Sequence, residues 1–118
     1  MNAIPQARRL RIILNETDKL GHRSLAEQIV HEAHAAGLSG ATVVRGILSY
    51  GASAHFHASR VLDLANDLPV VIEIIDEEAK IDQFVPMVDK LFERAACGGI
   101  ITREGIEAWR PPHHGGKA

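Results

Sequence analysis

The feature that most constrains the fold is a near-continuous aliphatic run in the second half of the chain. Residues 68–76 read Leu-Pro-Val-Val-Ile-Glu-Ile-Ile-Asp. Their length and β-branched content predict a strand, and apolar side chains pointing in both directions predict a central strand whose two faces are both covered. The remainder of the chain must therefore supply neighbouring strands and the layers that cover them.

The first half of the chain predicts two further strands and a helix between them. Residues 10–14 form a short apolar, β-branched run, and residues 41–48 form a second one. Ser24-Leu25-Ala26-Glu27 has the pattern of a capping box, in which a hydroxyl and a carboxylate satisfy free amides at a helix start. Apolar residues then recur at helical spacing until Gly37, which is expected to end this helix.

The second half predicts another helix and a last strand. Asp76 is expected to cap a helix from about residue 77, and the Gly98-Gly99 pair is expected to end it. Pro86 lies inside the apolar stripe and is expected to kink the helix, because it removes one backbone donor. Residues 100–109 then predict a broken strand. Between residues 51 and 60 we expect a loop, with a short helix near 58–64.

The element order β-α-β-β-α-β is that of an α+β, ferredoxin-like sandwich. In this fold an antiparallel four-stranded sheet carries both helices on one face. The other face stays bare in a single subunit, so the apolar residues expected on it predict self-association. We expect one domain over residues 8–110, with residues 1–7 and 111–118 as flexible termini.

Composition excludes several classes of partner and compartment. Thirteen Lys and Arg against fifteen Asp and Glu give a formal charge of −2, which offers no electrostatic reason to expect nucleic acid or an anionic membrane. The single cysteine, Cys97, allows no disulfide within the chain. The first residues have no apolar signal region, and no apolar stretch is long enough to span a membrane. We therefore expect a cytoplasmic protein.

Several segments together resemble the uncharacterised PII-like family known as domain of unknown function one-ninety, itself distantly similar to PII nitrogen-regulatory signalling proteins. The resemblance runs from about Leu10 to Trp109 and rests on five segments in order: Gly40-Ala41-Thr42-Val43-Val44-Arg45-Gly46, Tyr50-Gly51-Ala52-Ser53, His57, Asp67-Leu68-Pro69-Val70-Val71-Ile72-Glu73 and Lys80-Ile81.

The resemblance implies a homotrimer whose sheets face inward, with small-molecule sites in the clefts between subunits. It implies an adenine nucleotide (AMP, ADP or ATP) as the effector and, by family analogy, a membrane transport or channel protein as a partner. The stretch that matches the lysine-bearing phosphate loop of true PII proteins, residues 96–102, contains two glycines and no lysine.

The candidate ligand-binding residues gather around two glycine-bearing segments. Exposed backbone amides near Gly46, Gly51 and Ala52 can form an anion cradle to which the Arg45 guanidinium adds paired donors. The alternative is that these glycines only allow the chain to turn and that Arg45 forms a surface ion pair. The resemblance extends the candidate set to Ser53, His57, Gly98 and Gly99.

The leading interpretation is a ligand-sensing signalling module that is not an enzyme. A second hypothesis is a small divalent-metal-binding protein that uses the His55-x-His57 pair, because alternate residues of an extended segment point the same way. A third is an enzyme with an intersubunit site, but the sequence contains no nucleophile elbow, phosphate-binding P-loop or Cys-x-x-Cys pair. Cys97 is expected to be a small packed residue, because a helix C-terminus does not lower a thiol pKa.

Overall fold

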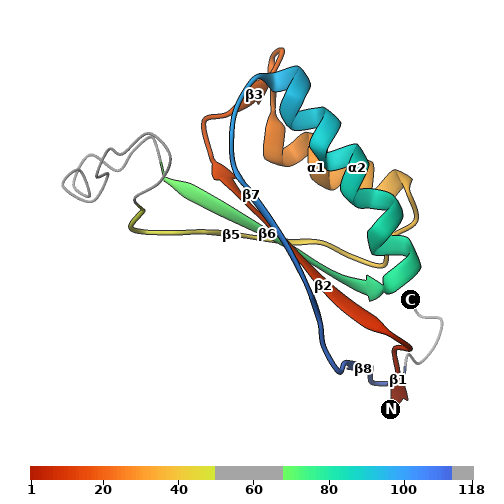
Figure 1. Ribbon diagram of the computed structural model, residues 1–118. Helices are drawn as coiled ribbons and strands as arrows, with labels where there is room; N and C mark the ends of the chain where they lie inside the picture. The colour runs from red at the N-terminus through yellow and green to blue at the C-terminus, as the bar shows by residue number, and fades with distance from the viewer. Residues whose placement is uncertain (50–67, 113–118) are drawn as a thin grey trace.

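The sheet is built on two long central strands that pair antiparallel over nine residues. In a computed structural model that describes residues 1–49 and 68–112, strand β2 (Ala7–Asn15) pairs with β6 (Pro69–Glu77) from Ala7↔Glu77 to Asn15↔Pro69 (Figure 1). The aliphatic run of residues 68–76 is thus a central strand, as its composition predicted. Strand β2 extends beyond the apolar run at 10–14 to include Ala7, Arg8 and Arg9 at one end and Asn15 at the other.

Two shorter strands complete the sheet in the order β5-β6-β2-β7. Strand β5 (Thr42–Arg45) pairs with β6, and β7 (Ile100–Gly105) pairs with β2, both antiparallel. With helices α1 (Leu25–Ala35) and α2 (Glu78–Ala95), these elements form the predicted α+β ferredoxin-like fold. Both helices lie on one face of the sheet, side by side (Figure 1).

The core lies between that face and the helices. From Leu10 to Asn15 in β2 and from Pro69 to Asp76 in β6, buried and half-buried residues alternate, because successive side chains of a strand point to opposite faces. The sheet contributes Leu10, Ile12, Leu14, Val70, Ile72 and Ile74 to the core, and the helices contribute Leu25, Ile29, Ala33, Ile81, Phe84, Val88, Leu91 and Phe92.

Neither helix covers the opposite face of the sheet (Figure 1). The strand register places its residues in rows across the sheet. One row is wholly aliphatic and crosses all four strands as Val44, Val71, Ile13 and Ile100. The next row is polar and consists of Thr42, Glu73, Arg11 and Thr102. We call this surface the uncovered face; its aliphatic row is 54% exposed at Val44 and 57% exposed at Ile100.

The helix ends only partly follow the prediction. The Ser24 hydroxyl accepts a hydrogen bond from the Glu27 amide at 3.2 Å, so the predicted cap of α1 is confirmed. The cap predicted at Asp76 is wrong, because the N-cap of α2 is Glu77 and Asp76 makes other hydrogen bonds. The end predicted at Gly98-Gly99 is also wrong, since Ala96 ends α2 in a left-handed conformation with φ of 56°. The helix runs unbroken through Pro86.

Two small ladders were not predicted. Strand β1 (Asn2–Ala3) pairs with β8 (Trp109–Arg110), and β3 (Lys19–Leu20) pairs with β4 (Arg23–Ser24). Residues 1–7 include one strand of the first ladder and the buried Ala7. The flexibility of this segment stays a prediction. The predicted 51–60 loop and 58–64 helix lie outside the described residues. Among the helices of the described part, none has the length and apolar character needed to cross a membrane.

Gly99 and Gly98 are adjacent but differ in their surroundings. A Cβ atom on Gly99 would lie 2.6 Å from the Ile13 carbonyl oxygen and 2.8 Å from Cε1 of Phe92, whereas a Cβ atom on Gly98 would meet nothing within 4 Å. The backbone of Gly99 therefore passes close to strand β2, where a side chain would overlap main-chain atoms that cannot move independently.

We predict that Gly99→Ala destabilises the protein by about 1–3 kcal/mol, the usual cost of overpacking, and that Gly98→Ala changes stability far less. Urea unfolding of both variants, followed by circular dichroism at equal protein concentration, measures the difference. Equal unfolding midpoints for the two variants would contradict the close approach of Gly99 to β2.

Candidate functional site

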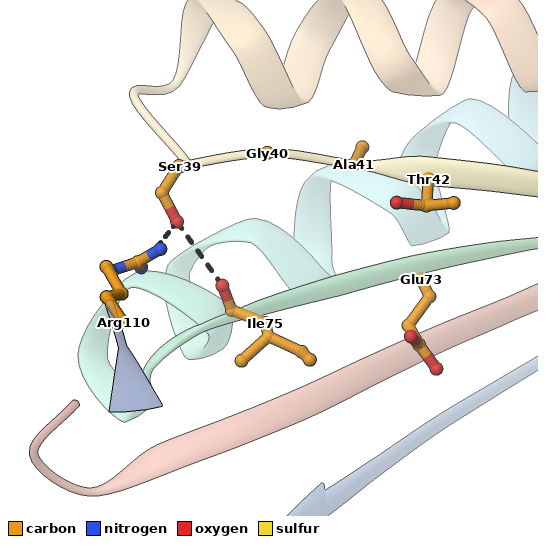
Figure 2. Close-up of a pocket in the computed structure, with 7 residues that line it drawn as sticks. All are labelled: Ser39, Gly40, Ala41, Thr42, Glu73, Ile75 and Arg110. Carbon is orange, nitrogen blue, oxygen red and sulfur yellow. Dashed lines mark hydrogen bonds between the residues drawn. The ribbon is translucent and has the colours of Figure 1, made fainter. Parts of the chain in front are cut away.

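A shallow pocket of about 280 Å³ opens where the chain leaves α1 and enters β5. Figure 2 shows its lining, which comes from three separate parts of the chain. Residues 39–42 form one wall, Glu73 and Ile75 of β6 form the floor, and Arg110 of β8 closes one end. The pocket therefore lies at an outer edge of the sheet, since β5 is the first strand in the sheet order.

Ser39 connects these three parts through hydrogen bonds. Its hydroxyl donates to the Ile75 carbonyl oxygen at 3.3 Å and accepts from Nη2 of Arg110 at 2.8 Å (Figure 2). Its backbone amide donates to Oδ2 of Asp76 at 3.0 Å. One residue thus ties the start of the β5 segment to strand β6 and to the C-terminal ladder.

Asp76 anchors this connection from inside the protein. It is only 3% exposed and is the one charged side chain among the buried residues of the described chain. Its Oδ1 accepts from the Glu77 amide at 2.8 Å, while Oδ2 accepts from the Ser39 amide. A buried carboxylate is tolerated only when its oxygens are hydrogen-bonded, so these two amides hold both Asp76 and the pocket wall in place.

The charges that line the pocket differ in how far they are neutralised. Glu73 accepts from Nε of Arg11 at 3.0 Å, and Nε of Arg9 lies 3.9 Å from the same carboxylate oxygen. Arg110, in contrast, has no carboxylate partner among residues 1–49 and 68–112 and makes its hydrogen bond with the neutral Ser39 hydroxyl. Among the described residues Arg110 therefore makes no direct ion pair, and the nearest acidic group in its hydrogen-bond network is Asp76, which is bound to the amide of the same Ser39.

A second polar region lies at the other end of β5 and contains two of the predicted cradle residues. The Arg45 guanidinium pairs with Glu16, with Nη2 2.5 Å from Oε2. The Gly46 amide donates to the Pro69 carbonyl oxygen at 2.8 Å, and a Cβ atom on Gly46 would lie 2.7 Å from Cγ of Pro69. Both residues thus have structural partners within the subunit, and their contact with a ligand stays a prediction.

Of the predicted glycines that the structure describes, Gly46 is not brought together with Gly98 and Gly99 within one subunit. Gly98 and Gly99 precede β7, which is the outer strand on the opposite side of the sheet from β5. Three strand spacings separate the two outer strands, about 14 Å at the usual spacing. Gly46 and Gly99 nevertheless lie at the same end of the sheet, because Arg45 pairs with Val70 and Ile100 pairs with Ile13.

The other predicted residues are not in the described part of the chain or carry no sign of activation. Gly51, Ala52, Ser53, His55 and His57 lie outside the described residues, so the predicted cradle and the predicted metal pair both stay predictions. Within residues 1–49 and 68–112, no group of three His, Cys, Asp or Glu side chains is arranged to hold a metal. Burial raises the pKa of the Cys97 thiol, and Asp18 raises it further by its charge and a hydrogen bond, which disfavours the nucleophilic thiolate.

Sequence reasoning did not select the pocket residues Ser39, Thr42, Glu73 and Arg110 as ligand contacts. Thr42 and Glu73 fall inside the motif segments, and their pairing across β5 and β6 follows from strand register. Arg110 gave no such signal, because its position depends on the short ladder between the two ends of the chain.

Comparison with known proteins places the chain in an established family. Residues 7–108 match the DUF190 family, described as "Uncharacterized ACR, COG1993". A UPF0166 protein of Aquifex aeolicus is 35% identical over 98 residues, covering 83% of this chain and 89% of its own. A UPF0166 protein of Methanocaldococcus jannaschii is 37% identical over 98 residues, covering 81% of this chain and 85% of its own.

Two solved structures share the fold. CPII of Thiomonas intermedia K12, a nitrogen regulatory PII-like protein bound to ADP, AMP and bicarbonate, superposes with a TM-score of 0.67 at 21% identity, over 89% of this chain and 90% of CPII. A putative PII-like signaling protein from Thermus thermophilus has a TM-score of 0.65 at 16% identity, covering 92% of this chain and 94% of its own. At these identities the likeness is one of fold.

We predict that Asp76→Asn lowers the free energy of unfolding by about 1–3 kcal/mol, the cost of leaving a buried hydrogen-bonding group unmatched. The introduced amide group would face one of the two backbone amides that the carboxylate now accepts from. Asp89→Asn on the exposed side of α2 is the matched control. Denaturant unfolding that affected the two variants equally would contradict the anchoring role of Asp76.

Proposed function

Because the chain belongs to the DUF190 family and has a PII-like fold, we propose that it is a non-enzymatic, trimeric sensor that binds an adenine nucleotide in clefts between its subunits. The observation that carries the proposal is the position of the pocket. It lies at the open edge of β5, next to the uncovered face, where a second subunit would complete its wall. CPII, which shares the fold, was solved with ADP and AMP bound.

The strand directions support an assembly of this kind. All neighbours in the order β5-β6-β2-β7 are antiparallel, so the two outer strands also run antiparallel to each other. If a second subunit places its β7 beside β5 of the first, these two strands also run antiparallel, as neighbours within each sheet do. Repetition of such a head-to-tail contact closes a ring when the rotation fits.

This arrangement would unite residues that one subunit keeps apart. Val44 and Ile100 lie in the same row of the uncovered face. If the outer strands of two copies meet in that register, Arg45 and Gly46 of one subunit face Gly98 and Gly99 of the next. The cleft then runs along β5 from this region to the pocket, and the three steps from Thr42 to Arg45 span about 10 Å.

The uncovered face supplies the reason to assemble. A row of four aliphatic side chains on a solvent-exposed sheet is unfavourable, and its burial in a trimer would remove that apolar area from water. The charged residues beside the row oppose burial less than unpaired charges would, because Arg11 and Glu73 already form an ion pair.

We predict that Ile100→Asp dissociates the assembly, because it places an uncompensated charge in the aliphatic row. Light scattering should then give a mass near that of one 12.8 kDa chain, where the wild-type protein gives about three times that value. Met87→Asp is the control, since Met87 is 36% exposed on α2 and away from the uncovered face. Retention of the wild-type mass by Ile100→Asp would contradict assembly through this face.

We predict that AMP, ADP or ATP raises the melting temperature of the wild-type protein and that GMP at the same concentration does so much less. A ligand that binds only the folded state stabilises it by about 2.7 kcal/mol at a hundredfold excess over its Kd, which moves the melting temperature by several degrees. Differential scanning fluorimetry with calorimetric titration measures both effects. Unchanged melting with all three adenine nucleotides, and no heat of binding, would refute the nucleotide-sensing proposal.

A further inference from the structure

We propose that Glu104 of each subunit forms an ion pair with Arg110 of the next subunit, and that this pair selects the register in which identical chains assemble. The pair rests on the trimer of the proposed function and supplies the pocket with a residue that a single chain does not place there. Three features of the described chain point to it: the matching side chains of the two outer strands, the open space beside Gly40, and the unused hydrogen-bonding groups of the two charged residues.

The two outer strands carry the same kinds of side chain when one of them is read backwards. Residues 42–44 of β5 are Thr-Val-Val, and residues 102, 101 and 100 of β7 are Thr-Ile-Ile. An antiparallel contact in this register sets threonine beside threonine and β-branched aliphatic residues beside each other, which are favourable pairs across neighbouring strands. Among the described strands, β5 pairs only with β6 and β7 only with β2.

Other registers lose this match. A shift of one residue sets side chains of the uncovered face beside side chains of the helix face, because the two faces alternate along each strand. A shift of two residues keeps the faces but sets Thr42 beside Ile100, or Val44 beside Thr102. The register that aligns the threonines is therefore the one that the side chains favour.

This register brings Glu104 of one subunit to the pocket of the next. Continuing the same pairing by two residues beyond the threonines sets Glu104 beside Gly40, which lines the pocket. A Cβ atom placed on Gly40 would meet nothing within 4 Å in the described chain, so the glutamate enters open space. Its side chain comes from the uncovered face, since Glu104 pairs with Arg9 and Arg9 pairs with Ile75 of the pocket floor.

The two charges are complementary, and each has hydrogen-bonding groups to spare. Arg110 makes no direct ion pair among the described residues, and its Nη2 donates to the Ser39 hydroxyl at 2.8 Å. The Glu104 side chain is 50% exposed, and its Oε2 lies 3.0 Å from Nη2 of Arg9. Its Oε1 has no partner in the described chain and can accept from a second guanidinium. Arg9, Glu104 and the next subunit's Arg110 would then form one row of alternating charges across the boundary.

Arg110 is held in position before a second subunit arrives. Its partner Ser39 donates to the Ile75 carbonyl oxygen and to the carboxylate of Asp76. On the other side, β8 pairs with β1 through Asn2↔Arg110. An arginine that is already ordered loses less entropy when it forms a contact with another subunit.

Glu73 is the acidic residue of the same pocket, and its repulsion of an incoming carboxylate is limited. Figure 2 shows it at the opposite end of the pocket from Arg110. Its Oε2 lies 3.0 Å from Nε of Arg11 and 3.9 Å from Nε of Arg9. The entering Glu104 therefore meets an unpaired cation at one end and an already paired anion at the other.

Two charge-reversed chains test whether the pair forms between subunits. Glu104→Arg sets two cations at every boundary, and Arg110→Glu sets two anions there. Each chain alone should therefore need a concentration at least about tenfold higher than the wild-type protein to assemble. In an equal mixture, a three-membered ring that contains both chains has two boundaries of opposite charge and one unfavourable boundary.

The mixture should therefore assemble at a concentration about tenfold lower than either chain alone. Light scattering over a dilution series measures the mass, and native mass spectrometry identifies the mixed rings. Glu104→Arg also disturbs the contact with Arg9 within its own subunit. That disturbance is the same alone and in the mixture, so the gain on mixing reports only the boundary.

Asp89→Arg and Lys90→Glu are the matched controls. Both residues are exposed on α2, and the two substitutions change the net charge by the same amounts as the test pair. Each control chain should keep the wild-type mass, alone and mixed. If circular dichroism shows that a reversed chain does not fold, Glu104→Gln and Arg110→Gln take its place. The combined neutral variant should then weaken assembly less than the two single effects together, because both remove the same contact.

A mixture that assembles no better than its separate chains would overturn the pair, and so would additive effects of the two neutral substitutions. Wild-type assembly by either reversed chain would overturn it as well. In each of these cases a wild-type trimer whose melting temperature still rises with an adenine nucleotide leaves the proposed function intact. A wild-type protein that stays monomeric at every concentration would refute the proposed trimer, and the pair with it.

Discussion

The antiparallel pairing of β2 with β6 determines which side chains form the core and which lie on the uncovered face. Their nine-residue antiparallel register puts Leu10, Ile12 and Ile72 on the face that the helices cover. The same register forces the intervening residues onto the other face, because successive side chains alternate. A shift of one residue would exchange the two faces, so the hydrophobic core and the uncovered face are specified together.

The candidate site is a consequence of where that sheet ends. Strand β5 is short and, among the described strands, pairs only with β6, and the segment before it borders an open pocket. Asp76 stabilises this edge from beneath through the Ser39 amide. Asp76 accepts from the amides of Ser39 and Glu77, so one buried carboxylate connects the pocket wall to the start of α2.

Charge neutralisation distinguishes the two polar ends of β5 more sharply than residue type does. Both ends contain an arginine and small or hydroxyl residues, and both suit an anion by composition. Glu16 occupies Arg45 at one end, whereas Arg110 at the other end contacts only the neutral Ser39 hydroxyl among the described residues. Because ion pairing depends on distances in space, this difference is invisible in the order of residues along the chain.

The sequence by itself determined the element order, the ferredoxin-like class, the cap at Ser24 and the central place of residues 69–77, because these follow from local periodicity and capping chemistry. The prediction for the ends of α2 was wrong. Asp76 accepts a hydrogen bond from the Ser39 amide while Glu77 is the N-cap, and Ala96 adopts the left-handed conformation expected of a glycine. Only the tertiary structure decided that Gly46 packs on Pro69, that Gly99 packs on β2 and that the two ends of the chain pair to place Arg110 at the pocket. The reason is physical: each of these contacts joins residues far apart in the chain, and no local pattern encodes the distance between them.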